Sequence, residues 1–205
     1  MSDTRLNAEE KALLKSTIGK ALVKYRHDPF AVTPSFTMHG EVFFEGLILS
    51  LWCDEHPIDF FESGKEGVSS LSVRQIEEKD AVSALEGVEQ IDFPVGQKVK
   101  DVLLVEESIQ EFVNGVPGET YRLTRGIVFV LEDIEIGFEK DVWLSVEIYP
   151  HKGKNVAESF DKLGGDLSGW PKGCMSKNER VVYSLSDGRI VSTERNETGE
   201  DPCAD

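Results

Sequence analysis

Carboxylate side chains are the most concentrated chemical feature of this sequence, and they gather on one predicted hairpin. Five acids and a nearby tryptophan occupy this segment: Glu132, Asp133, Glu135, Glu139, Asp141 and Trp143. Apolar residues alternate with the acids at the period of two that is typical of a strand, so Glu135 and Glu139 should point together to the outward side. Outward carboxylates could dock a basic partner, with Trp143 as an aromatic anchor. The sequence therefore predicts a partner-binding site at these six residues, although a solvated face that keeps the protein soluble has the same composition.

A second group of residues could in principle ligate a metal ion. Cys53, Asp54 and His56 lie within four positions, and His39 could approach them from the preceding strand if the two segments pair. Pro57 follows at once, which favours a turn with solvated acids over a metal site. We therefore expect no metal and no cofactor. The four histidines of the chain stand in no recognisable catalytic motif, so we predict no catalytic residues and favour a protein that is not an enzyme.

Composition narrows the class of partner. The chain has 205 residues, of which 22 are Lys or Arg and 38 are Asp or Glu, giving a formal net charge of −16. An acidic surface repels phosphate, so we expect no nucleic-acid partner. No apolar run approaches the roughly 20 residues of a membrane-spanning helix, so we expect no membrane partner. Three cysteines without CxxC spacing and the lack of a secretory signal predict a reducing, cytoplasmic location.

The elements that must position these side chains begin with a helix. Asn7 and Glu10 have the spacing of a helix-capping pair, and apolar residues then recur every three or four positions. Asp28-Pro29 disfavours continuation, so the sequence predicts an amphipathic helix over about 7–27. Its polar face is basic, in contrast to the acidic remainder of the chain.

The rest of the sequence indicates mainly strands. Residues 53–70 read as a long polar connection, and short helices are expected over 80–86 and 155–163. Period-two patterns and turn residues predict strands over 36–44, 47–52, 99–105, 121–131, 134–138, 143–149, 180–185 and 189–193. The predicted fold is α+β and mostly antiparallel β, a curled sheet or sandwich-like meander. Residues 1–194 should form one domain, followed by a flexible acidic tail over 195–205.

Three hypotheses for function remain open. The leading one is a non-catalytic binding protein, inhibitor- or immunity-like, that recognises a basic protein partner by electrostatic complementarity. The second is a carboxylate- or metal-dependent enzyme of unknown substrate. The third is a homo-oligomeric subunit in which the basic N-terminal helix packs on the acidic body of another copy.

Overall fold

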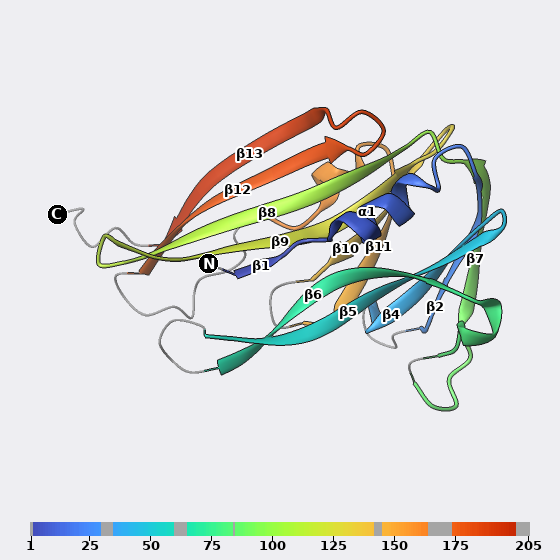
Figure 1. The fold of residues 1–205 in the computed structure, drawn as a ribbon, viewed down its shortest axis with the longest axis horizontal. Helices are drawn as coiled ribbons and strands as arrows, with labels where there is room; N and C mark the ends of the chain where they lie inside the picture. The colour runs from blue at the N-terminus through green and yellow to red at the C-terminus, as the bar shows by residue number, and fades with distance from the viewer. Residues whose placement is uncertain are drawn as a thin grey trace.

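The computed structural model describes residues 2–29, 35–59, 65–83, 85–141, 145–163 and 174–199 of the chain. Over these residues the protein is mostly antiparallel β, with two sheets and one short α-helix near the N-terminus (Figure 1). The prediction of an α+β fold built mainly from antiparallel strands is confirmed.

The larger sheet has eight strands, with the order β13-β12-β8-β9-β10-β11-β3 and β1 paired to β9. Its strands are β1 (Ser2–Thr4), β3 (Phe36–Thr37), β8 (Asp101–Val113), β9 (Val116–Val130), β10 (Glu135–Lys140), β11 (Glu147–Gly153), β12 (Cys174–Ser184) and β13 (Ile190–Gly199). The β1–β9 pairing is parallel and the others in this sheet are antiparallel. Asn114 and Gly115 connect β8 to β9 with φ angles of 50° and 76°. Positive φ at both positions is what a tight two-residue hairpin turn requires.

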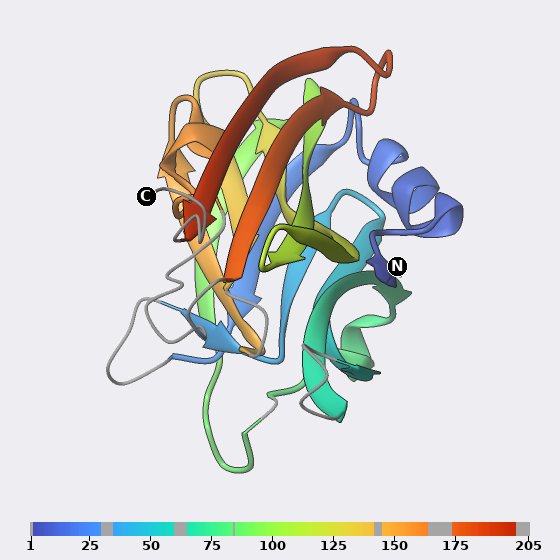
Figure 2. The same cartoon turned by 90° about the vertical axis from the view of Figure 1, so that its left-hand side faces the viewer.

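The smaller sheet has five strands in the order β6-β5-β4-β2-β7. They are β2 (Ala21–His27), β4 (His39–Phe44), β5 (Leu47–Asp59), β6 (Lys65–Ile76) and β7 (Ile91–Lys98). The chain passes between the two sheets four times: from β1 to β2, from β2 to β3, from β3 to β4 through Met38, and from β7 to β8. Figures 1 and 2 show that the two sheets consequently lie as two curved layers.

One hydrophobic core lies between the two sheets. Leu104, Ile127 and Phe129 of the larger sheet belong to the same buried cluster as Leu49 and Leu51 of the smaller sheet. All five side chains are fully buried. Because successive strand residues point to opposite faces, the residues between them face outward on each sheet.

The N-terminal helix is shorter than predicted. Helix α1 covers Ala8–Lys15 and begins with the expected capping pair, in which Asn7 accepts from two backbone N–H groups and the Glu10 carboxylate accepts from the Asn7 N–H at 2.8 Å. The chain then turns at Gly19, where φ is +88°. The prediction of a helix over 7–27 was wrong in its second half, which is strand β2. Pairing with β4 on one side and β7 on the other places Leu22 and Tyr25 of this strand in the core, and this tertiary packing overrides the helical spacing of the sequence.

Other predicted boundaries also change. Most of the polar region 53–70 is strand, at the end of β5 and the start of β6, rather than a connection. The helix expected over 80–86 is absent from the described residues after Asp80, where the 3₁₀ turn η1 (Glu78–Asp80) ends. The helix expected over 155–163 is reduced to the 3₁₀ turn η2 (Val156–Ser159). Residues 195–199 continue β13 instead of starting a tail, while 200–205 lie outside the described residues. Cross-strand pairing accounts for the strand extensions, because it satisfies backbone groups whether or not the side chains are apolar.

A small second core lies on the outer face of the larger sheet, which we define as the side turned away from the smaller sheet. Val156 and Phe160 from the η2 region pack there against Val105, Val128 and Val182. Two glycines leave room for this contact. A Cβ atom on Gly126 would lie 2.5 Å from Phe160 Cε2 and 2.6 Å from Phe138 O, and one on Gly137 would clash with Val156.

We expect Gly126→Ala to lower the free energy of unfolding by about 2 kcal/mol, because the added methyl group would force the Phe160 ring or the neighbouring strand out of place. Urea denaturation gives the comparison with wild type. Gly153→Ala is the matched control, since no atom lies within 4 Å of the added Cβ there. Equal losses in the two variants would contradict this account of Gly126.

Candidate functional site

The predicted acidic hairpin is present, but its carboxylates are not equivalent. Glu132 and Asp133 are exposed in the turn between β9 and β10, and Asp141 is half-buried just after β10. Trp143 lies outside the described residues, so its predicted role as an anchor has no structural description. The exposed part of this hairpin is therefore its tip.

Glu135 and Glu139 share the outer face of β10, where the residues of η2 lie over them. Glu135 Oε2 accepts a hydrogen bond from the Val156 N–H at 2.7 Å, at the start of η2. Glu139 is only 2% exposed. Both acids lie on one face of β10, as the alternation of apolar and acidic residues predicts, but Glu139 is buried and its carboxylate is not accessible to a partner.

Glu139 is the centre of a buried ionic network. Its Oε1 accepts from Arg125 Nε at 3.1 Å and Nη2 at 2.8 Å, and its Oε2 lies 2.8 Å from His151 Nε2. The Asp161 N–H also donates to Oε1, at 2.8 Å. Burial by itself would raise the pKa of Glu139, but the His151 hydrogen bond, the Arg125 charge and the Asp161 N–H together hold this pKa below its usual range.

A second arginine extends the network along the same face. Arg180 Nε donates to Glu107 Oε1 at 2.9 Å, and Arg180 Nη2 donates to the Asp161 carbonyl. Arg125 Nε lies 4.0 Å from the same Glu107 oxygen. The network thus fixes the residues after η2 to the sheet. Neither arginine was predicted as a site residue. Arg125 could have been found as a charge within the apolar second half of β9, whereas Arg180 shares its face of β12 with the polar residues Ser176 and Asn178 and gives no such signal.

Ser159, His151 and Glu139 form a chain of hydrogen-bonding groups with the residue types of a nucleophilic relay. Ser159 Oγ lies 3.3 Å from His151 Nδ1, on the opposite side of the ring from Glu139. However, Ser159 donates its hydroxyl proton to the Val156 carbonyl at 2.7 Å. The proton therefore points away from His151, and the geometry is that of a capped 3₁₀ turn rather than an activated serine.

Among the described side chains, the candidate metal ligands His39, Cys53 and Asp54 have separate partners. His39 Nδ1 lies 2.8 Å from Glu41 Oε1, and Asp54 accepts from Arg74 at 2.7 Å. Cys53 points into the core, where burial raises the pKa of its thiol to about 12. The side chain of His56 lies outside the described residues. Within the described ranges, no group of three or more His, Cys, Asp or Glu side chains could hold a metal ion.

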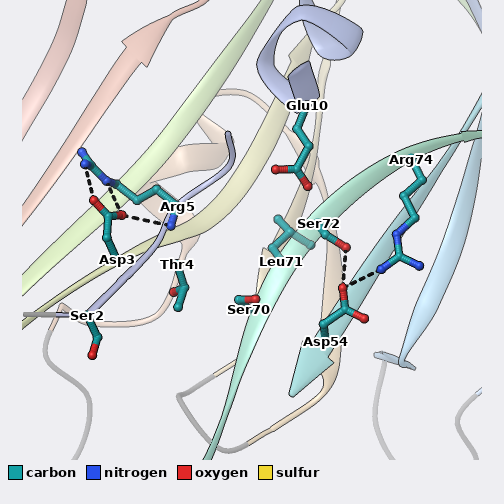
Figure 3. Close-up of a pocket in the computed structure, with 10 residues that line it drawn as sticks. All are labelled: Ser2, Asp3, Thr4, Arg5, Glu10, Asp54, Ser70, Leu71, Ser72 and Arg74. Atoms are coloured by element: carbon teal, nitrogen blue, oxygen red, sulfur yellow. Dashed lines mark hydrogen bonds and ion pairs between the residues drawn. The ribbon is translucent and has the colours of Figure 1, made fainter. Parts of the chain in front are cut away.

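A polar groove of about 560 Å³ separates β1 from β6, below α1. Figure 3 shows Glu10 reaching down from α1 between these strands, where its Oε1 accepts from the Val73 N–H at 3.0 Å. The charged side chains on each side of the groove pair locally: Asp3 with Arg5 at 2.6 Å, and Asp54 with Arg74 at 2.7 Å. The groove therefore presents little uncompensated charge to a ligand.

Uncompensated acids gather instead on residues 77–90, which we call the acidic segment. It follows β6 and leads into β7. Four of its acids are exposed and form no ion pair with any described residue: Glu78, Asp80, Glu86 and Glu89. Val82 and Leu85 lie between them with 60% and 37% of their surface exposed. The sequence shows these acids, but only the structure shows that they have no ion-pair partner among the described residues, whereas Glu139 is paired with Arg125.

Asp92, just after the acidic segment, behaves differently from its neighbours. It pairs with Lys24 at 2.7 Å and with Arg26 at 2.6 Å. The Arg26 hydrogen bond and then the Lys24 hydrogen bond lower the pKa of Asp92 to about 2. Its charge is therefore compensated within the smaller sheet, and it does not extend the acidic segment.

Among the residues that the structure describes, no helix combines the length and apolarity needed to span a membrane. Comparison of the whole chain with protein-family models, curated proteins and solved structures finds no match. The functional argument therefore depends on the residues and geometry described above.

Proposed function

We propose that this protein is a non-catalytic binding module, inhibitor- or immunity-like, that recognises a basic protein partner. The observation that carries the proposal is the acidic segment, whose four exposed acids have no described ion-pair partner. Its one lysine, Lys79, pairs with Glu77 at 2.6 Å. This local excess of acids is part of a net charge of −16 over the whole chain. A negative charge of this size would steer a basic partner toward the protein.

The exposed apolar side chains favour a protein surface as the partner over a small cation. Val82 and Leu85 lie among the acids of the segment and are exposed. Interfaces between proteins combine an apolar centre with a polar rim, whereas a small cation gains nothing from contact with apolar side chains. The tip of the predicted hairpin, Glu132 and Asp133, supplies a second exposed acidic site for the same kind of partner.

The described cysteines fit a reducing compartment. Cys53 and Cys174 are both free and buried, as is common for thiols in cytoplasmic proteins. We therefore propose that binding takes place in the cytoplasm.

Neutralising the acidic segment should reduce capture of basic proteins without unfolding the chain. The test variant is Glu78→Gln/Asp80→Asn/Glu86→Gln/Glu89→Gln, and the matched control removes four exposed charges outside both acidic sites: Glu9→Gln/Glu45→Gln/Glu55→Gln/Glu158→Gln. Each immobilised protein is incubated with extract from its source cells at low and moderate salt, and the captured proteins are quantified by mass spectrometry. Exposed charges contribute little to folding, typically below about 1 kcal/mol per pair, so the variants should keep the wild-type melting temperature.

The expected result is a basic protein that wild type and the control capture and the segment variant does not, with capture falling as salt rises. Equal loss in the control would show that capture depends on the net charge of the chain and not on the acidic segment, and would refute the proposal. Recovery of the same proteins in the same amounts from all three would reduce the acids to a solubility feature and refute the proposal.

A further inference from the structure

Arg122, on β9, is the exception among the arginines of this protein. The chain has eight arginines, all within the described residues. Seven of them form an ion pair with Asp or Glu: Arg5, Arg26, Arg74, Arg125, Arg180, Arg189 and Arg195. The half-buried side chain of Arg122 makes no hydrogen bond or ion pair with any described residue. Because the 38 acids of the chain outnumber its 22 bases, a half-buried arginine that forms no ion pair with a carboxylate is unexpected.

Arg122 lies in a row of polar side chains that crosses four strands. Its cross-strand neighbours are Asp3 on β1 and Ser108 on β8. Ser108 in turn lies opposite Glu179 on β12. Residues paired in this way point to the same face of a sheet, so two acids lie at the ends of the row, with Arg122 and Ser108 between them.

Both of these acids are already occupied. Asp3 accepts two hydrogen bonds from Arg5, at 2.9 and 2.6 Å, and Glu179 accepts from Arg195 Nε at 2.6 Å. Glu106, the next acid on this face, accepts hydrogen bonds from Arg5, Lys11 and Tyr183. The carboxylates around Arg122 are therefore hydrogen-bonded to other cations, and Arg122 interacts with Asp3 through its charge alone, without a hydrogen bond.

A pocket of about 300 Å³ lies over these two groups, and Arg5, Val181 and three glutamates also line it. Each glutamate is paired with a cation other than Arg122: Glu106 with Arg5 and Lys11, Glu107 with Arg180, and Glu179 with Arg195. The Ser108 hydroxyl, like the Arg122 guanidinium, makes no hydrogen bond with the described residues. The two free groups thus provide hydrogen-bond donors and a positive charge at one place. A guanidinium presents paired N–H donors in the spacing of two oxygens of a carboxylate or phosphate.

We propose that this pocket binds an oxyanion, a carboxylate or a phosphate group, through Arg122 and Ser108. Arg122 supplies the charge and a forked pair of N–H donors, and Ser108 donates a further hydrogen bond. Arg5 stays on Asp3 and Glu106 and contributes positive potential at the wall of the pocket. This site is separate from the acidic segment and does not depend on the proposed function.

The test is an NMR titration of the ¹⁵N-labelled full-length protein with inorganic phosphate, and separately with acetate, at constant ionic strength. We expect saturable shifts of the Arg122 Nε–H signal and the Ser108 amide signal. Saturation by phosphate alone identifies a phosphate site, saturation by acetate alone a carboxylate site, and saturation by both a site for the shared oxyanion chemistry. Arg122→Gln should abolish the shift of the Ser108 amide signal. Arg122→Lys should weaken anion binding about tenfold, because an ammonium group lacks the paired N–H donors of a guanidinium.

Arg189→Gln is the control, since this arginine is 73% exposed and lies away from the pocket; it should leave the affinity unchanged. Three results would overturn the proposal: no saturation up to about 50 mM, where even a millimolar site is filled; equal shifts with chloride; or shifts of Ser108 that survive Arg122→Gln. The amide spectrum of each variant reports whether the fold is intact, so loss of binding in an unfolded variant is not counted as support.

Discussion

Glu139→Gln should lower the free energy of unfolding by about 3–5 kcal/mol, because it leaves the buried charge of Arg125 without its main partner. The Arg125 side chain is 6% exposed and donates two hydrogen bonds to Glu139. Glutamine keeps the shape of the side chain but removes the negative charge. Glu107, 4.0 Å from Arg125 Nε, remains as a partial counter-ion, so the loss should fall toward the lower end of this range. Urea denaturation at pH 7 measures the effect.

The double variant Arg125→Met/Glu139→Leu separates the cost of an unpaired charge from the value of the ion pair. Buried ion pairs can be replaced by apolar groups with little loss, so the double variant should be more stable than Glu139→Gln. Glu132→Gln, at the exposed hairpin tip, should change stability by less than about 0.5 kcal/mol. A Glu139→Gln protein as stable as Glu132→Gln would show that Arg125 finds sufficient compensation elsewhere.

Glu111 should make the stability of this protein fall as the pH rises above 4.5. The residue is 3% exposed on β8, and its Oε1 makes no hydrogen bond within the described part of the chain. Burial, and then the charge of Glu119, raises the pKa of Glu111 from 4.5 to about 7. Below pH 4.5 the carboxyl is protonated in both the folded and the unfolded chain, so it costs nothing. Between pH 4.5 and about 7 only the unfolded chain releases the proton, which favours unfolding.

Glu111→Gln removes this titration. At pH 8 the variant should exceed wild type in free energy of unfolding by up to about 3 kcal/mol, at 1.36 kcal/mol per pKa unit. At pH 4 the two proteins should be equal. Chemical denaturation at both pH values makes the comparison, with Glu132→Gln as the exposed control that changes little at either. A constant difference between wild type and Glu111→Gln across this range would show that Glu111 ionises normally in the folded protein.

The sequence predicted correctly those features that depend only on residues within a single helix or strand. The Asn7–Glu10 capping pair is present as the sequence predicts, because it depends on backbone groups only a few residues away. The alternation over 134–138 likewise placed Glu135 and Glu139 on one face. These features follow from spacing alone.

Features that depend on distant residues were not predictable in this way. The segment 21–27 has helical spacing, yet it is a strand because β4 and β7 pair with it. Glu139 has the sequence context of a surface acid, yet Arg125, His151 and the Asp161 N–H enclose it. Arg122 is one of two arginines three positions apart on β9, and nothing in the sequence separates the paired one from the free one.

The sequence by itself determined the chemical inventory and the local geometry of this protein: an excess of 16 acids over bases, a mostly antiparallel β fold and its tight turns. These follow from composition and from interactions within a few residues. Only the tertiary structure decided which charges remain available, because an acid or a base is neutralised by partners that the fold brings from far along the chain. It buried Glu139 beside Arg125, left four exposed acids of the acidic segment without ion-pair partners among the described residues, and paired Asp3 and Glu179 with Arg5 and Arg195 rather than with Arg122.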